Sequence, residues 1–289
     1  MRPRGFARSL AFLPLTLGGA ALLFPLWWMV VVSLETPERA GAAITGGTGL
    51  TLWPPSPQWQ NYPDALREMG GAEPWSGFTN ALANSVVVTV LVVIGTILSS
   101  SLVGYAFARL RFRGREGLFL VMLGTMMLPG QVTIIPLFLL FRSLGWIDSL
   151  LPLAVPAFFG NAFFIFMYRQ FVAQLPESLF EAARIDGYGH LGIWLRIILP
   201  LCKPVNAICA VFTFVAVWND FLGPLVYLHS DEQATLAVAL NSFRNQYGGL
   251  EDVHLLMAAS LVTMVPCILL FLAAQRQFVE GLSQGAVKG

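Results

Sequence analysis

Charged side chains are scarce in this sequence of 289 residues. Only 11% of the residues are Asp, Glu, Lys or Arg, against about 25% in an average soluble domain, while 56% are apolar. A chain with so few charges is not built mainly for a water-facing surface. It also lacks a basic run with interleaved aromatic residues, so nucleic acid is not expected as a partner.

Cysteine is rare, and the three cysteines, Cys202, Cys209 and Cys267, form no CxxC pair. No histidine stands at ligand spacing from them, so the sequence predicts neither a metal site nor a cofactor. Because free cysteine is among the most often buried residue types, we expect all three to be small core residues.

Catalytic motifs are also missing. The sequence has no GxxxxGK[ST] phosphate-binding loop, no HExxH and no evident Ser/His/Asp or paired-carboxylate arrangement. The chain is therefore not expected to be an enzyme or to hydrolyse ATP itself. If it takes part in active transport, the energy must come from a partner.

Long apolar segments are abundant. A bilayer core about 30 Å thick requires roughly 20 apolar residues in a helix, whereas membrane strands alternate over about ten residues. Because only helices and closed barrels satisfy their backbone in lipid, these runs predict an all-α integral membrane protein with six transmembrane helices. The predicted spans are residues 10–32, 81–104, 118–141, 150–167, 205–228 and 255–274.

The first span follows a basic flank and also admits a cleaved signal peptide. Its apolar run exceeds the usual 7–15 residues or so of such a signal, and no small-x-small site follows it. We therefore interpret residues 1–33 as a retained N-terminal transmembrane helix.

Basic residues indicate the orientation. With the N-terminus in the cytoplasm, thirteen of the seventeen Lys and Arg residues lie inside, as the positive-inside rule requires. Both termini are then cytoplasmic, residues 34–78 form an extracytoplasmic loop, residues 79–280 a core, and residues 281–289 a cytoplasmic tail. One inside loop holds four arginines, which we interpret as topology determinants and lipid-phosphate contacts, with contact to a partner as an alternative: Arg109, Arg111, Arg113 and Arg115.

The largest inside loop, residues 172–204, contains a pattern of helix, glycine break and second helix. Pro176 suits a first helical turn, and Gly187 stands where a left-handed residue ends a helix. Leu175, Leu179, Ala182 and Ala183 are predicted to share one face, whose small residues let another surface approach. The alternative is an amphipathic hairpin that lies on the inner leaflet.

This loop resembles the EAA loop of binding-protein-dependent ABC importer permeases, whose pattern is EAA, three residues, G, nine residues and I-x-LP. The sequence matches every fixed position of that pattern: Glu181, Ala182, Ala183, Gly187, Ile197, Leu199 and Pro200. The resemblance implies the type I ABC importer permease fold. It also implies that these residues couple the chain to an ATPase subunit, because in that family the helix docks into a cleft of the ATP-binding subunit.

Residues from about 80 to 289 are similar to the sugar-importer branch, in particular to the smaller permease of maltose-type transporters. The similarity rests on Met127-Leu128-Pro129, Trp218-Asn219-Asp220 and the C-terminal Gly285-Ala286-Val287-Lys288-Gly289, among other stretches. It implies a sugar substrate, a second permease that is a different chain, two ATPase subunits and an extracytoplasmic sugar-binding protein. The location implied is a bacterial or archaeal cell (inner) membrane. Residues 41–75 match no pattern of the family.

Asp220 is the only Asp, Glu, Lys, Arg or His residue within the six predicted spans, and Asn219 lies beside it. The pair is a candidate polar lining of the sugar path, and helix packing against the second permease is the alternative. Ion-driven carriers keep ionisable groups near the midplane, which this chain largely lacks. An ion-coupled or passive carrier that works without an ATPase, and a scaffold without transport, remain the alternative functions.

Overall fold

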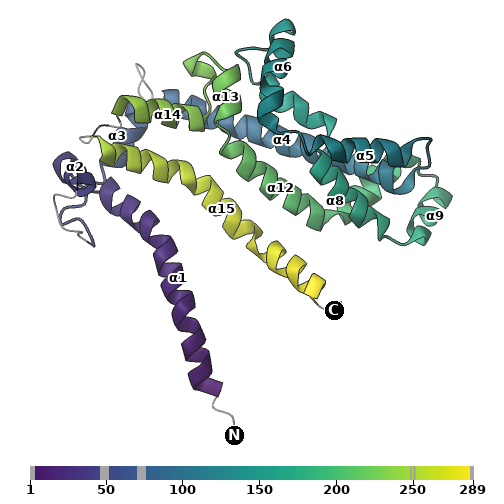
Figure 1. The fold of residues 1–289 in the computed structure, drawn as a ribbon, viewed down its shortest axis with the longest axis horizontal. Coiled ribbons are helices and arrows are strands. Elements are labelled where there is room, and N and C mark those ends of the chain that lie inside the picture. The colour runs from purple at the N-terminus through teal and green to yellow at the C-terminus, as the bar shows by residue number, and fades with distance from the viewer. Residues whose placement is uncertain (1–3, 46–51, 70–75, 248, 250–251, 287–289) are drawn as a thin grey trace. The chain divides into compact units, whose positions relative to one another are not determined.

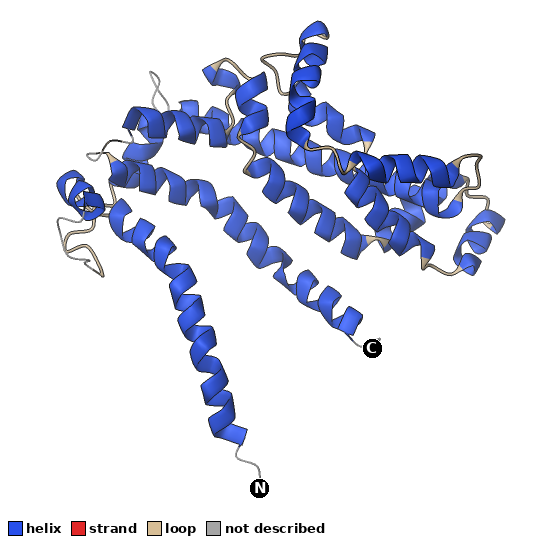
Figure 2. Ribbon diagram, viewed as in Figure 1, coloured by secondary structure: helices blue, strands red, loops and turns tan. Residues whose placement is uncertain are grey.

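The computed structural model describes residues 4–45, 52–69, 76–247, 249 and 252–286. Figure 2 shows helices joined by loops, and the described residues contain no strand, as the sequence predicted. Figure 1 labels the main helices. The elements are α1 Arg4–Ser33, α2 Pro37–Thr45, α3 Asn61–Glu68, α4 Ser76–Arg109, α5 Arg115–Thr125, α6 Gly130–Ser143, α7 Leu151–Ala154, the 3₁₀ turn Val155–Phe159, α8 Ala162–Ala173, α9 Glu177–Ile185, α10 His190–Ile193, the π turn Trp194–Ile198, α11 Leu199–Leu201, α12 Lys203–Trp218, α13 Leu222–Tyr227, the 3₁₀ turn Asp231–Gln233, α14 Leu236–Tyr247 and α15 Val253–Ala286.

Among the residues that the structure describes, four helical stretches are long and apolar enough to cross a membrane, and they correspond to the first, second, fourth and sixth predicted spans. Two bent helix pairs raise the number to six if each pair is one span: residues 115–143 and 190–218. The four continuous stretches are Pro14–Ser33, Gly77–Arg109, Leu151–Ala173 and Val253–Gln275.

The third predicted span is not one continuous helix. Helices α5 and α6 meet at an angle of 99° across residues 126–129. Pro129, which precedes the first residue of α6, is extended with φ −61° and ψ 133°. A proline has no N–H to continue the helix and disfavours helical dihedrals at the residue before it, so the break falls at Leu128 and Pro129.

The fifth predicted span also differs from the structure. Helix α12 ends at Trp218, and the short helix α13 begins only at Leu222, so residues 205–228 are interrupted at Asn219 and Asp220. On its other side, α12 continues residues 190–201 with a bend of 78°. The sequence predicted residues 190–201 to lie in a loop, but together with α12 they are long and apolar enough to cross a membrane.

The described chain divides into two compact units. The first comprises residues 1–78 and 239–265. Here the side-chain amide of Asn61, at the start of α3, donates to the carbonyls of Ser33 at 2.8 Å and Glu35 at 3.0 Å. The Ser33 hydroxyl also lies 2.9 Å from the Tyr62 hydroxyl. The two bonds of Asn61 satisfy the carbonyl of Ser33, the last residue of α1, and that of Glu35 just beyond it; carbonyls at the C-terminal end of a helix have no partner within the helix.

The second unit comprises residues 79–238 and 266–289. Its core surrounds Tyr168 of α8, which is fully buried. Helix α4 approaches α8 closely at Gly104, where an added Cβ would lie 2.5 Å from the Cβ of Tyr168, so only glycine fits there. The buried residues of this core are Tyr105, Phe164, Tyr168, Val172, Phe180, Ala183, Ile193, Ile198, Cys202, Val205 and Cys209. Two of the three cysteines are therefore core residues as predicted, while Cys267 is half-buried.

Candidate functional site

The residues that match the EAA pattern lie in a segment that we call the EAA segment, residues 176–200. Its first helix, α9, turns Phe180 and Ala183 into the core of the second unit. Because consecutive helical residues are about 100° apart, Ile185 lies near the centre of the opposite face, and Glu181 is exposed on the same face. The most exposed apolar residue of that face is Ile185, at 86%. The helix thus has one side anchored in the chain and one side open.

The two alanines of the pattern do not share a face, contrary to the sequence prediction. Ala182 is exposed, whereas Ala183 is 3% exposed and packs inside the chain. The prediction grouped Leu179, Ala182 and Ala183, but the apolar face that the helix buries follows Phe180 and Ala183, three residues apart. The small side chain of Ala183 therefore lets α9 approach the chain's own core.

Gly187 ends α9 as the sequence predicted. Its φ is +82°, in the left-handed region that glycine adopts without strain. The N–H of Gly187 donates to the carbonyl of Arg184 at 3.0 Å, and the N–H of Tyr188 donates to the carbonyl of Ala183 at 3.0 Å. These two bonds form a Schellman cap, which fixes the direction in which the chain leaves α9.

The remaining fixed positions lie at the end of the EAA segment. Ile197 belongs to the π turn, Leu199 opens α11, and both are half-buried, while Pro200 is exposed. Proline removes one helical N–H and clashes with the carbonyl four residues earlier, which is a physical reason for a widened turn before Pro200. Such π turns are frequent at functional sites.

Arg109, the last residue of α4, contacts the residues at the start of the EAA segment. Its guanidinium donates to the Glu177 carboxylate at 2.7 Å and to the carbonyl of Val172 at 2.9 Å, and it also bonds the carbonyl of Leu175. It lies 4.2 Å from the centre of the Phe180 ring. With its side chain only 14% exposed, Arg109 is engaged inside the protein, which differs from the predicted role as a lipid contact.

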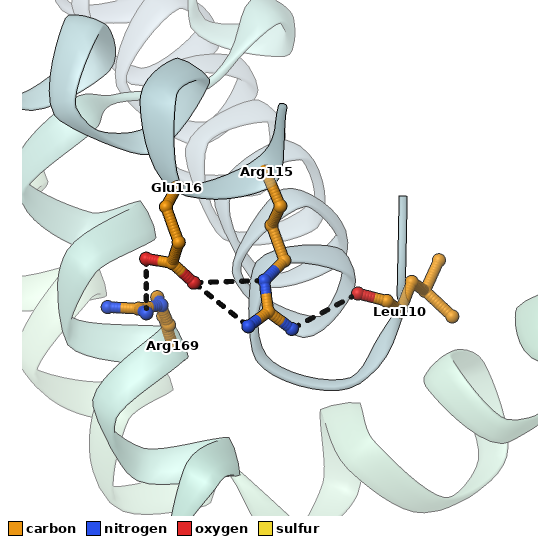
Figure 3. A network of polar contacts seen from close by, with 4 residues as sticks. All are labelled: Leu110, Arg115, Glu116 and Arg169. Carbon is orange, nitrogen blue, oxygen red and sulfur yellow. Dashed lines mark hydrogen bonds and ion pairs between the residues drawn. The ribbon is translucent and has the colours of Figure 1, made fainter. Parts of the chain in front are cut away.

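Arg115 and Arg169 form a second polar network with Glu116 (Figure 3). Arg115 donates to one Glu116 oxygen at 2.9 and 3.0 Å, and Arg169 donates to the other at 3.4 Å. Arg115 also donates to the carbonyl of Leu110 at 3.3 Å. Glu116 therefore links the start of α5 to α8, whereas Arg111 and Arg113 are exposed.

Asn219 and Asp220 lie in the break between α12 and α13. The Asn219 amide donates to the carbonyl of Val215 at 2.8 Å and so closes the end of α12. One oxygen of Asp220 accepts from the N–H of Gly223 at 3.2 Å in the first turn of α13. An added Cβ at Gly223 would lie 2.6 Å from the other Asp220 oxygen, so glycine makes room for this carboxylate.

An open cleft of about 270 Å³ borders Asp220 within the second unit. It runs between the N-terminal end of α6 and the α12–α13 break, and Gln131 and Tyr227 supply further polar groups. Amide, carboxylate and phenol groups together offer both donors and acceptors of hydrogen bonds, which is the chemistry that sugar hydroxyls require. The structure thus joins Asp220 to residues of α6 and α13.

Sequence reasoning did not find Arg109, Gln131 or Tyr227 as site residues. Nothing in its neighbourhood separates Arg109 from Arg111 and Arg113, because its partners lie more than sixty residues further along the chain. Gln131 stands directly after Pro129-Gly130 in an apolar run, and this isolated polar residue at a turn was a signal that could have been used.

Curated relatives resemble the chain over most of their length. The arabinooligosaccharides transport system permease protein AraQ of Halalkalibacterium halodurans is 34% identical over 279 residues, which cover 95% of this chain and 96% of that protein. The sn-glycerol-3-phosphate transport system permease protein UgpE of Pectobacterium atrosepticum is 34% identical, with 93% of each chain covered.

A solved structure is similar as well. A chain in the crystal structure of a bacterial ABC transporter involved in the import of the acidic polysaccharide alginate superposes with a TM-score of 0.77 at 25% identity, covering 94% of this chain and 96% of that chain. A family model matches residues 100–284, which include the EAA segment, Asn219 and Asp220. The chain belongs to the family of binding-protein-dependent transport system inner membrane components.

Proposed function

We propose that the chain is the membrane-spanning permease subunit of an ATP-driven, binding-protein-dependent sugar importer. Two ATPase subunits, a second and different permease and an extracytoplasmic sugar-binding protein complete the transporter. The relatives bear the names of transport-system subunits, so a solitary carrier is not favoured. The EAA segment faces the cytoplasm, together with both termini, and couples the chain to an ATPase subunit.

The form of α9 carries this proposal. Its inner side is fixed to the chain by Phe180, Ala183 and the Schellman cap, so the outer side is presented in one orientation. That outer side combines the exposed carboxylate of Glu181 with the exposed apolar side chain of Ile185. An exposed apolar side chain beside one charge suits a docking surface with an apolar contact and one ionic contact.

The charge of Asp220 bears on the class of sugar. The relatives include proteins named for arabinooligosaccharides, for melibiose, raffinose and stachyose, and for sn-glycerol-3-phosphate. A carboxylate that borders the cleft repels an anionic solute and accepts hydrogen bonds from hydroxyl groups. We therefore propose that Asp220 and Asn219 border the path of a neutral oligosaccharide, with packing against the second permease as the alternative.

Reversal of the charge at Glu181 tests the proposal. Loss of one partner from a buried charged pair costs about 2–5 kcal/mol, enough to uncouple docking. We expect Glu181→Lys to release the ATPase subunits from the solubilised complex and to abolish ATP-dependent uptake, while the permease still inserts. Glu232→Lys makes the same charge change at an exposed residue of another loop and is expected to retain both. Wild-type retention of ATPase by Glu181→Lys would contradict the proposal.

A further inference from the structure

One face of α4 contacts the EAA segment at three levels. Ser101, Tyr105 and Arg109 follow one another at intervals of four residues, which places them on the same side of the helix. Arg109 meets the start of the EAA segment through Glu177 and Phe180, as described above. All three residues belong to the second unit, so these contacts lie within one compact body.

The other two levels join α4 to both helices of the EAA segment. Tyr105 stacks on Phe180 of α9 with ring centres 6.4 Å apart, and its hydroxyl lies 3.3 Å from Nδ1 of His190 at the start of α10. One turn before Tyr105 in α4, the hydroxyl of Ser101 accepts a hydrogen bond from Nε1 of Trp194 at 3.0 Å. This face of α4 therefore contacts α9, the start of α10 and the π turn.

We propose that this face of α4 is the non-covalent connection through which a displacement of the EAA segment reaches the membrane spans, with Arg109 as its positioning residue. The proposal rests on the proposed function, because it assumes that an ATPase subunit displaces the EAA segment. It assigns no catalytic part to α4, which receives motion from the EAA segment and passes it on.

Arg109 has the contacts that a rigid joint requires. The guanidinium is held by the Glu177 carboxylate, by carbonyls at the C-terminal end of α8 and by the face of the Phe180 ring. If α9 moved away alone, a mostly buried charge would lose several partners at once, and stripping one partner from such a charge is strongly unfavourable. Helices α4, α8 and α9 are therefore expected to move together.

The covalent route from α9 toward α12 is less direct. From α9 the chain passes through the Gly187 cap, then through the π turn, and then through a 78° bend before it becomes α12. Each of these irregular points can absorb a rotation of α9. The contacts of α4 bypass all three points, because Arg109 and Tyr105 contact α9 itself.

Hydrogen exchange in the complete complex tests this connection, with the ATP analogue AMP-PNP as the probe. In the wild type, AMP-PNP is expected to change the exchange rate of the backbone amides of residues 98–109 by at least about fivefold, the lower end of ordinary coupling between sites. In Arg109→Gln the change is expected to remain in residues 176–187 and to vanish from residues 98–109. Arg113→Gln removes the same charge from an exposed neighbour and is expected to behave as the wild type.

The outcomes separate the two proposals. If AMP-PNP alters residues 98–109 equally in Arg109→Gln and in the wild type, the role of α4 is wrong while the proposed function stands. If AMP-PNP changes nothing in the wild-type EAA segment, the proposed function fails and this inference fails with it. Should Arg109→Gln not assemble, Arg109→Lys decides: lysine keeps the charge but cannot make the same forked contacts, so a reduced response supports the inference and a full response overturns it.

Discussion

The side-chain amide of Asn206 donates a hydrogen bond to the carbonyl of Leu199 at 2.9 Å, across the interruption between α11 and α12. Its oxygen accepts from the hydroxyl of Tyr168 at 2.7 Å. Carbonyls in the last turn of a helix have no partner within that helix, so the amide takes the place of a missing backbone N–H. Asn206 thereby ties the exit of the EAA segment to α8, just as Arg109 ties its entry.

Replacement of Asn206 by leucine is expected to destabilise the chain by about 1–3 kcal/mol, because the variant leaves the Leu199 carbonyl and the buried Tyr168 hydroxyl without this partner. The midpoint of thermal unfolding in detergent measures the loss. Asn219→Leu is the matched control: Asn219 is exposed and its amide donates to a carbonyl of its own helix, so solvent can replace that bond and we expect a clearly smaller effect. Equal losses in the two variants would contradict the bridging role of Asn206.

Two substitutions separate the charge of Asp220 from its hydrogen bond to Gly223. Asp220→Asn keeps an oxygen that accepts this bond, so the complex is expected to assemble, to retain uptake of the proposed neutral oligosaccharide and to discriminate less against an anionic solute such as sn-glycerol-3-phosphate. Asp220→Ala also removes the cap of α13, which costs about 0.5–2 kcal/mol. Competition between the two solutes in vesicles is the measurement. An unchanged preference in Asp220→Asn would favour the packing alternative.

Asp148 makes a pH-dependent connection between two loops. Its carboxylate accepts from the backbone N–H groups of His229 and Ser230 and from the Ser230 hydroxyl, each at 2.9 Å. These bonds, the one from the Ser230 backbone first, lower the pKa of Asp148 below its ordinary value of 3.8. Because the pKa is lower in the folded state, the contact stabilises fully above the ordinary value and is lost as the pH falls through the lowered one.

We therefore expect the connection at Asp148 to persist at pH 5 and to open only below about pH 4, its ordinary titration range. Hydrogen exchange at the His229 and Ser230 amides, measured as a function of pH, reports the opening. In Asp148→Asn, which does not titrate, the same amides are expected to lack this acid transition. A transition near pH 6 in the wild type would point to another group and would contradict the assignment.

The sequence predicted the helical class and the positions of the four continuous spans because length and apolarity are properties of the local chain. The role of Gly187 could also be predicted from the sequence, since a glycine at the end of a helical pattern commonly adopts the left-handed conformation that caps a helix. Because residues 118–141 are uniformly apolar, the sequence predicted one continuous helix there, which was wrong. Pro129 and Gly130 mark a break that the hydropathy of the segment does not reveal.

The sites that sequence reasoning missed depend on contacts between distant segments. The charge asymmetry assigned one role to four arginines, but the structure separates Arg109, held by Glu177, from the exposed Arg111 and Arg113. The face of α9 was misjudged for a related reason: several groupings of its apolar residues fit a helix, and packing around Phe180 selects one. The buried face of a helix and the partners of an arginine depend on residues that are distant in the sequence, so the pattern of one segment cannot predict them.

The orientation of the chain remains a prediction that follows from its basic residues. Because thirteen of the seventeen Lys and Arg residues fall on one side, reporter fusions after residues 112 and 185 are expected in the cytoplasm, and fusions after residues 60 and 240 outside. A reporter active only outside the cell membrane, paired with one active only inside, makes each position its own control. The exposed face of α9 can meet an ATPase only if residue 185 lies inside. An inside signal at residue 60 would therefore overturn the six-span topology, and an outside signal at residue 185 would remove the physical basis for coupling through Glu181.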